Sequence, residues 1–281
     1  MDRHLRGLDH LVVAVDDLDE AAERWERLGF TLTPRGRHPA WGTANRCVLL
    51  EGGYVELLAV ADPRADSPLA AALRAAGAGF FALAFSTDDP AATAAAWRTL
   101  GFSARGPEHL TRILEIDGEV ELRFCNVMLP PEETLGLRLF ACRHETPGLE
   151  RRPEWLDHAN RARRVVSVSV LAEPVEPVAE LFERVLGTAT RSQTDQLAAF
   201  HVGDDRVLVM PAEDVNLLHP EVEAEEREQP ARFVSLQVRV EDMERVAEIV
   251  AASGLAHRRI ADGIAVLPAE LGGVALEFTG P

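Results

Sequence analysis

The sequence predicts an α+β protein built from four copies of one β-α-β-β-β unit. The first copy opens with an apolar run of strand length, residues 8–15. A helix follows, with Leu18, Ala22, Trp25 and Leu28 at the spacing of one buried face. Three extended segments complete the unit, at residues 31–37, 43–51 and 54–60, with a Gly-Gly hairpin signal before the last.

Internal similarity at long spacing predicts the other copies. A shift of 72 residues matches Trp25 with Trp97, and a shift of 225 residues matches Gly29 with Gly254. Such self-similarity indicates a repeated supersecondary unit. Both tryptophans occupy one repeat position, which predicts helix-to-sheet packing for them. The predicted modules span residues 7–60, 79–144, 165–210 and 232–280.

The chain is long enough for two domains, each built from a pair of modules. The predicted N-terminal domain is residues 1–150, and the predicted C-terminal domain is residues 165–281. Residues 151–164 form the link between them. We expect Trp155 and Leu156 to anchor this link on the first half, although a plain connection fits the sequence equally well.

Composition excludes several classes of function. The net charge of −17 argues against binding to nucleic acid or to an anionic membrane surface. The 29 basic residues are all arginine, which excludes Schiff-base lysine chemistry. Cys47, Cys125 and Cys142 lie in apolar runs and are expected to be reduced, buried thiols. No signal peptide or membrane span is recognisable, which predicts a cytoplasmic protein, as a monomer or a homodimer.

Particular motifs carry a family resemblance. Asp-His-Leu-Val-Val-Ala-Val at residues 9–15 and Gly-Gly-Tyr-Val-Glu-Leu at residues 52–57 resemble the vicinal oxygen chelate superfamily. That superfamily includes glyoxalase I, bleomycin-resistance proteins, methylmalonyl-CoA epimerase and extradiol dioxygenases. His-Pro-Ala-Trp-Gly-Thr-Ala-Asn at residues 38–45 resembles its glyoxalase-like domain branch. The resemblance implies two glyoxalase-like domains, each with a cupped mixed sheet.

The resemblance also implies where metal ligands would lie, on the first and last strands of each module. In the first half these positions hold His10, Glu56, Ala82 and either Leu139 or Phe140. A catalytic dication generally needs about three protein ligands. His10 and Glu56 therefore form an incomplete set, which His38 or His144 could extend. The cofactor stays unknown, and a divalent metal stays one of the alternatives.

His10 and Glu56 also have two readings without a metal. A buried histidine paired with a carboxylate can simply stabilise the structure. The same pair can act as general acid and base on an oxygenated substrate. Six further residues are predicted to line a small-molecule pocket with this pair: His38, Trp41, Thr43, Asn45, Arg138 and His144. Arg138 could pair with a substrate carboxylate unless strand alternation directs it outward.

The second half has fewer candidate residues. Its first-strand positions are Val166 or Ser167 and Ser235, and Glu277 lies on the last strand. The iron of extradiol dioxygenases needs two histidines and a carboxylate. We therefore expect no such dioxygenase, and we expect the second half to be a degenerate structural copy. The acidic stretch at residues 211–231 is interpreted as solvated surface.

Two functions remain in view. One is a lyase, isomerase or hydrolase acting on a small oxygenated metabolite through His10 and Glu56. The other is a non-catalytic protein that sequesters a small molecule, as bleomycin-resistance proteins do. A structural module without a ligand is the weakest alternative, because polar residues face the inside of the first cup.

Overall fold

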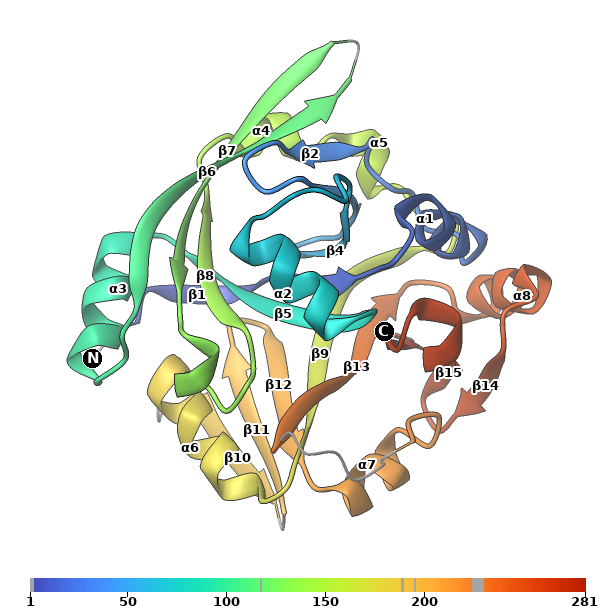
Figure 1. Cartoon of the computed structure of the whole chain (residues 1–281). Helices are drawn as coiled ribbons and strands as arrows, with labels where there is room; N and C mark the ends of the chain where they lie inside the picture. Colours follow the sequence, from blue (N-terminus) through green and yellow to red (C-terminus); the bar gives the residue numbers. More distant parts are fainter. Residues whose placement is uncertain (1–2, 117, 188–189, 195, 224–229) are drawn as a thin grey trace.

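The computed structural model describes the chain except residues 1–2, 117, 188–189, 195 and 224–229 (Figure 1). Its first part is a closed barrel of eight strands in the order β1-β4-β3-β2-β6-β7-β8-β5. The first module supplies β1 (Leu5–Ala14), α1 (Leu18–Arg27), β2 (Gly36–His38), β3 (Thr43–Leu49) and β4 (Tyr54–Val60). The second supplies β5 (Gly79–Thr87), α3 (Pro90–Thr99), β6 (Arg105–Glu115), β7 (Glu119–Met128), η1 (Pro131–Glu133) and β8 (Leu139–His144), and α2 (Pro68–Ala76) lies between the two modules.

The C-terminal part is an eight-stranded sheet in the order β10-β11-β12-β9-β13-β16-β15-β14. Its first module contains β9 (Ala162–Ala172), α6 (Val175–Leu186), β10 (Arg191–Thr194), β11 (Leu197–Val202) and β12 (Asp205–Met210). After α7 (Ala212–Leu218) come β13 (Ala231–Val240), α8 (Met243–Ser253), β14 (His257–Ile260), β15 (Gly263–Val266), η3 (Pro268–Leu271) and β16 (Ala275–Thr279). The prediction of four β-α-β-β-β modules in two paired sheets is confirmed.

The repeat is visible in the N-cap residues of three helices. Asp17, Asp89 and Asp242 occupy the same position before α1, α3 and α8, and each carboxylate accepts a hydrogen bond from a backbone N–H of the first turn. Such caps satisfy donors that have no partner inside the helix. Three of the four helices therefore begin where the sequence alone directs them to begin.

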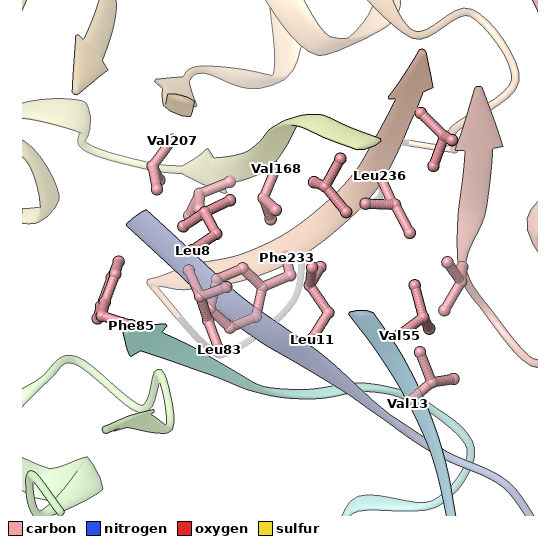
Figure 2. Close-up of a cluster of buried hydrophobic side chains, with 14 of the residues drawn as sticks. Leu8, Leu11, Val13, Val55, Leu83, Phe85, Val168, Val207, Phe233 and Leu236 are labelled. Atoms are coloured by element: carbon pink, nitrogen blue, oxygen red, sulfur yellow. The ribbon is translucent and has the colours of Figure 1, made fainter. Parts of the chain in front are cut away.

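A shared apolar core joins the two sheets. Residues of β1 and β5 pack against residues of β9 and β13, as Figure 2 shows for Leu11, Leu83, Val168 and Leu236. Trp25 and Trp97 are almost completely buried in this core, as their repeat position predicts. Its outer helices also connect the halves, because Trp97 Nε1 donates to the backbone carbonyl of Val185 at 3.0 Å.

Strand alternation then separates the two faces of β1. Leu11 and Val13 contact the shared core, whereas Val12 and Ala14 belong to a second apolar cluster inside the barrel. Alternating side chains point to opposite faces of a strand. His10 shares the parity of Val12, so it faces the barrel interior.

One predicted strand is shorter in the structure. The sequence predicted extended chain over residues 31–37, but β2 covers only Gly36–His38. The residues before it bond irregularly to β3, where the Cys47 backbone N–H donates to Thr33 Oγ1 at 3.0 Å and the Thr33 N–H donates to the Cys47 carbonyl at 2.9 Å. A side chain that takes the place of a ladder partner interrupts regular pairing.

The link between the sheets packs on the barrel, as the anchor prediction requires. The short helix α4 (Pro147–Glu150) precedes it and α5 (Pro153–Leu156) lies in it, where Trp155 is buried in the interior cluster of the barrel. His158 is also buried, with Nε2 at 2.7 Å from the Leu49 carbonyl and Nδ1 accepting from the Thr31 N–H at 3.0 Å. Within the described residues, no helix has the length and apolarity needed to cross a membrane.

Candidate functional site

A cavity of about 430 Å³ lies inside the barrel. Strands β1, β4, β5, β6, β7 and β8 contribute to its wall, and Pro68, Leu69 and Ala72 of the helix α2 region lie along it. Apolar side chains form much of the lining, with a limited set of charged and polar groups among them. This combination is typical of sites for small molecules.

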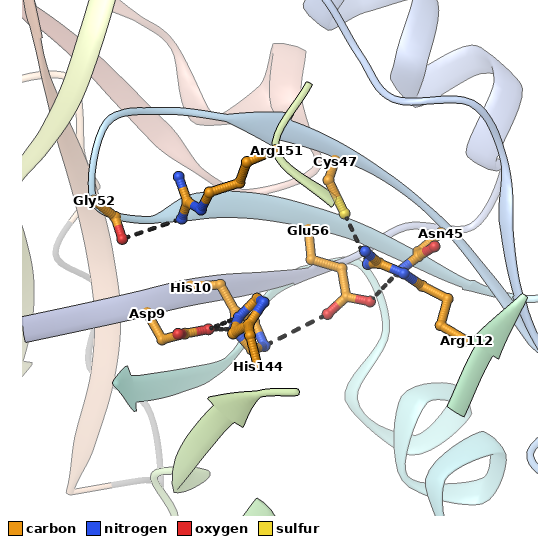
Figure 3. A network of polar contacts seen from close by, with 9 residues as sticks. All are labelled: Asp9, His10, Asn45, Cys47, Gly52, Glu56, Arg112, His144 and Arg151. Atoms are coloured by element: carbon orange, nitrogen blue, oxygen red, sulfur yellow. Dashed lines mark hydrogen bonds and ion pairs between the residues drawn. The ribbon is translucent and has the colours of Figure 1, made fainter. Parts of the chain in front are cut away.

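Glu56 and His10 lie together on the cavity wall (Figure 3). Glu56 Oε2 is 3.7 Å from His10 Nε2, and its other oxygen, Oε1, accepts a hydrogen bond from Asn45 Nδ2 at 2.5 Å. The parallel pairing of β1 with β4 produces this contact, because Val12 lies opposite Glu56 and His10 opposite Tyr54. The imidazole of His10 stacks on Tyr54, with ring centroids 4.4 Å apart.

Asp9 holds the other side of His10. Its Oδ1 lies 2.5 Å from His10 Nδ1 and 3.1 Å from His144 Nε2. Burial raises the pKa of Asp9, but His144 and His10 lower it more, so the pKa is held well below its usual range. Asp9 is therefore an anion that accepts N–H bonds from both imidazoles, and His10 Nε2 is left facing Glu56.

A β-bulge gives Asp9 this position. Leu8 pairs with Phe85 and His10 with Ala84, so Asp9 is an extra residue between two consecutive pairs. The bulge turns two consecutive side chains toward the same side, which regular alternation forbids. Gly53 permits the close approach, since a Cβ there would lie 2.7 Å from the Asp9 carbonyl oxygen.

His38 and Trp41 lie at another part of the wall. Thr43 Oγ1 is 3.0 Å from His38 Nδ1 and holds the ring in place. Burial lowers the pKa of His38 to about 4, with Glu56 raising it and Arg112 lowering it further. His38 is therefore a neutral imidazole at physiological pH, which can bind a polar ligand without adding charge.

Arg112 of β6 is the most buried cation of the cavity, with 4% of its surface exposed. Its Nη1 donates to Cys47 Sγ at 3.3 Å, and its guanidinium lies over the ring of Phe124 at 5.2 Å. Gly36 of the neighbouring strand makes room for it, because a Cβ there would lie 2.9 Å from Arg112 Cδ and 2.2 Å from Asn45 Oδ1.

Two more arginines, Arg105 and Arg138, also line the cavity, as does the amide of Asn126. Arg138 lies over the ring of Phe81 at 4.6 Å, and burial lowers its pKa. The buried Oδ1 of Asn126 has no hydrogen-bond partner among the described residues. Three guanidinium groups against Glu56 and Glu108 give this wall an excess of positive charge.

The structure brings the eight predicted residues into one region but gives them different positions. Five of them line the cavity: His10, Glu56, His38, Trp41 and Arg138. Three lie behind it: Thr43 holds His38, Asn45 holds Glu56, and His144 holds Asp9. Arg138 precedes β8, so strand alternation does not direct it away from the cavity.

Sequence reasoning missed Asp9, Arg112 and Asn126. Asp9 has the wrong parity for a regular strand, and only the bulge reveals its role. Arg112 and Asn126 lie on the two strands of one hairpin, in a module whose family-type positions are apolar. The available signal was weak: both alternate in phase with apolar residues of their own strand.

The metal suggested by the superfamily does not fit His10 and Glu56. Among the described residues, neither belongs to any group of three His, Cys, Asp or Glu ligand atoms lying within 4.8 Å of one another. Asp9, Cys142 and His144 do form such a group beside them. There Asp9 Oδ1 already accepts from two imidazoles, so the charge of this carboxylate is compensated within the protein.

Comparisons with solved structures show the fold. A hypothetical protein from Staphylococcus aureus aligns with a TM-score of 0.69 and 14% identity, covering 98% of this chain and 99% of the other. A xylose isomerase-like TIM barrel/4-hydroxyphenylpyruvate dioxygenase fusion protein aligns with a TM-score of 0.62 and 13% identity, covering 98% of this chain and 49% of the fusion protein. A mutant 4-hydroxymandelate synthase from Streptomyces coelicolor aligns at 0.58 and 14%, covering 98% and 92%.

A search of curated proteins gave no match. The model of the glyoxalase-like domain matches residues 8–186, which begin within β1, include the rest of the barrel and continue through β9 and α6. This span is more than half of the chain and contains every residue of the cavity described above. The chain therefore belongs to the glyoxalase-like domain family.

Proposed function

We propose that the barrel binds a small oxygenated metabolite carrying a carboxylate, and that it catalyses a proton transfer of the lyase or isomerase type. The observation that carries this proposal is the buried chain Asn45–Glu56–His10–Asp9 on the wall of the 430 Å³ cavity. General acids and bases must be oriented within reach of the substrate, and this chain fixes both.

The arginines support the substrate class. Arg112, Arg105 and Arg138 line a volume large enough for a small metabolite. Guanidinium groups bind carboxylates through paired, charge-assisted hydrogen bonds. The unpartnered Asn126 Oδ1 adds an acceptor for a hydroxyl group of the ligand.

In the proposed reaction, Glu56 is the base. Its Oε2 takes a proton from a carbon next to a substrate carbonyl; the C–H electron pair forms the enolate double bond, and the negative charge moves to the carbonyl oxygen. His10 Nε2 and Glu56 Oε2 are 3.7 Å apart, beyond direct hydrogen-bond distance, so a water molecule between them carries that proton from Glu56 to His10. Return of a proton to carbon gives an isomer, and departure of a neighbouring leaving group gives a lyase product.

Asp9 is a positioning residue in this scheme. It fixes the Nδ1–H tautomer of His10 and stabilises the imidazolium that forms when Nε2 receives a proton. Asn45 does the same for Glu56 by binding Oε1 and leaving Oε2 directed at His10.

The test has two steps. A panel of small 2-oxo and 2-hydroxy carboxylates is screened for a rise in melting temperature. Compounds that bind are then incubated in D₂O, and deuterium incorporation at the carbon next to the carbonyl is followed by NMR. We expect incorporation with the natural chain and a loss of about 10²- to 10⁴-fold in Glu56→Gln and in His10→Asn.

The control is His201→Asn, since His201 is exposed on β11 of the other sheet. It should leave both binding and exchange unchanged. Binding with no exchange in any compound would contradict the catalytic proposal and favour sequestration. Exchange that persists in Glu56→Gln would place the base elsewhere.

A further inference from the structure

The C-terminal sheet contains a second buried cluster, formed by His219, Glu221 and Glu277. One ligand atom from each lies within 4.8 Å of the others, and at most 6% of any of these residues is exposed. Glu277 lies on β16, whereas His219 and Glu221 follow α7 in the segment that connects the two C-terminal modules. The acidic stretch was interpreted as solvated surface; for Glu221 that interpretation is wrong.

Hydrogen bonds fix two members of the cluster. His219 Nδ1 contacts Glu277 Oε1, and its Nε2 is 2.8 Å from Ser169 Oγ. Ser235 Oγ donates to the same Glu277 oxygen at 2.5 Å. Ser169 and Ser235 lie opposite each other on β9 and β13, so their two hydroxyl groups contact His219 and Glu277 from the same part of the sheet.

Glu221 is the exception. Both of its carboxyl oxygens are buried, and neither has a hydrogen-bond partner among the described residues. A buried carboxylate without a hydrogen-bond donor is costly, and one imidazole cannot compensate the charges of both Glu221 and Glu277.

We propose that His219, Glu221 and Glu277 bind one divalent transition-metal cation of the Zn²⁺, Fe²⁺ or Mn²⁺ class. One imidazole nitrogen and two carboxylates suit these ions better than Ca²⁺ or Mg²⁺, which prefer oxygen ligands alone. The cation supplies the positive charge that the two carboxylates lack, and it gives the oxygens of Glu221 a partner.

The surrounding contacts prepare the ligands. With its Nε2–H donating to Ser169 Oγ, His219 can bind the cation through Nδ1, and the cation then replaces the proton shared between Nδ1 and Glu277 Oε1. Ser235 holds the Glu277 carboxylate in place. Hydrogen bonds of this kind orient the residues that bind a metal directly and tune the basicity of their ligand atoms. Two of the three ligands come from the segment between modules, so the set differs from the strand positions that the family resemblance implies.

The full chain, stripped of metal with a chelator, is titrated with Zn²⁺ by calorimetry and with Co²⁺ by visible absorption. We expect one equivalent per chain, a rise in melting temperature, and Co²⁺ bands typical of nitrogen and oxygen ligands. In Glu221→Gln and His219→Ala, affinity should fall at least 10-fold and the Co²⁺ spectrum should change.

Two controls keep this test specific. Glu213→Gln changes an exposed acid on α7 and should bind as the natural chain does. Glu56→Gln in the barrel should also bind normally, which separates this site from the proposed catalytic pair. Gln has nearly the same shape as Glu, so the Glu221→Gln variant is expected to fold. A cooperative melting curve checks this.

Several results would overturn the proposal. Absence of binding by the natural chain would make the cluster a plain hydrogen-bonded core. Binding retained in both Glu221→Gln and His219→Ala, or lost in Glu56→Gln, would place the cation elsewhere. Selective binding of Ca²⁺ or Mg²⁺ over Zn²⁺ and Co²⁺ would contradict ligation by His219.

Discussion

The two sheets share one architecture but treat their concave faces differently. In the barrel, the segment between modules forms α2, whose Leu69 and Ala72 lie along the wall of an open cavity. In the C-terminal sheet the corresponding segment forms α7 and then turns inward, where Val215, His219, Glu221 and Val222 are buried against the sheet. One connection leaves room for a ligand, and the other fills that room with its own side chains.

The charges of the two faces differ in the same way. In the barrel, Asp9 and Glu56 lie among imidazoles and guanidinium groups, so each carboxylate has partners. In the C-terminal cluster, neither carboxyl oxygen of Glu221 has a hydrogen-bond partner among the described residues. The difference shows that the fold does not fix the chemistry of the cup; the connecting segment and the arginines of one hairpin do.

The largest effect is expected at the best-paired carboxylate. Asp9→Asn leaves two buried imidazoles without their anion, and breaking such a pair costs about 3–5 kcal/mol of folding free energy. Urea unfolding at pH 7 measures it. A loss of folding free energy below about 1 kcal/mol would show that the Asp9 contacts contribute little. The buried carboxylates of the two halves would then not differ in how strongly their neighbours stabilise them.

The next largest effect is expected in the pH dependence of folding stability, through His38 of the barrel. The pKa of His38 is lowered to about 4 by burial, whereas an unfolded histidine titrates near its ordinary value of 6.5. Between these values the unfolded chain binds more protons, so stability is complete above pH 6.5 and falls as the pH drops toward 4. Since His38 is only partly buried by exposed area, we expect about 1–3 kcal/mol.

Comparison of His38→Gln with the natural chain at pH 7 and at pH 4.5 isolates this contribution. The variant should lose less stability between the two pH values. An identical loss in both proteins would show that His38 keeps an ordinary pKa.

A glycine in the barrel offers a smaller, steric test. In Gly36→Ala the new Cβ would lie 2.2 Å from Asn45 Oδ1, so Asn45 and Arg112 must move. Overpacking of this kind costs about 1–3 kcal/mol, and any ligand that Arg112 binds should bind more weakly. Gly148→Ala is the matched control, because nothing lies within 4 Å of its Cβ. Equal melting temperatures for the two variants would argue against the tight fit.

The smallest effect is expected to have the opposite sign. In metal-free protein, Glu221→Gln removes a buried carboxylate that lacks partners, so stability at pH 8 should rise by about 1 kcal/mol. Chemical unfolding in the presence of a chelator checks this, with Glu213→Gln as the exposed control. Destabilisation instead of stabilisation would mean that the Glu221 charge is already compensated without a cation.

Local periodicity determined most of the fold. The apolar spacing of the helices, the Asp caps of α1, α3 and α8, and the alternation of β1 and β4 are properties of short segments that the repeat copies along the chain. The family resemblance singled out His10 and Glu56, and strand alternation agrees with their place on the inner face beside Val12 and Leu58. These features were therefore predictable without any knowledge of tertiary contacts.

Only the tertiary structure decided how the sites are completed. The bulge at Asp9, the register that brings Arg112 and Asn126 to the cavity, and the inward turn of His219 and Glu221 all depend on pairings between distant segments. One extra residue in a strand reverses the face that follows, and a polar run can be surface or ligand set according to what covers it. The sequence by itself determined the scaffold and the inner-face positions of His10 and Glu56, and packing decided what surrounds them.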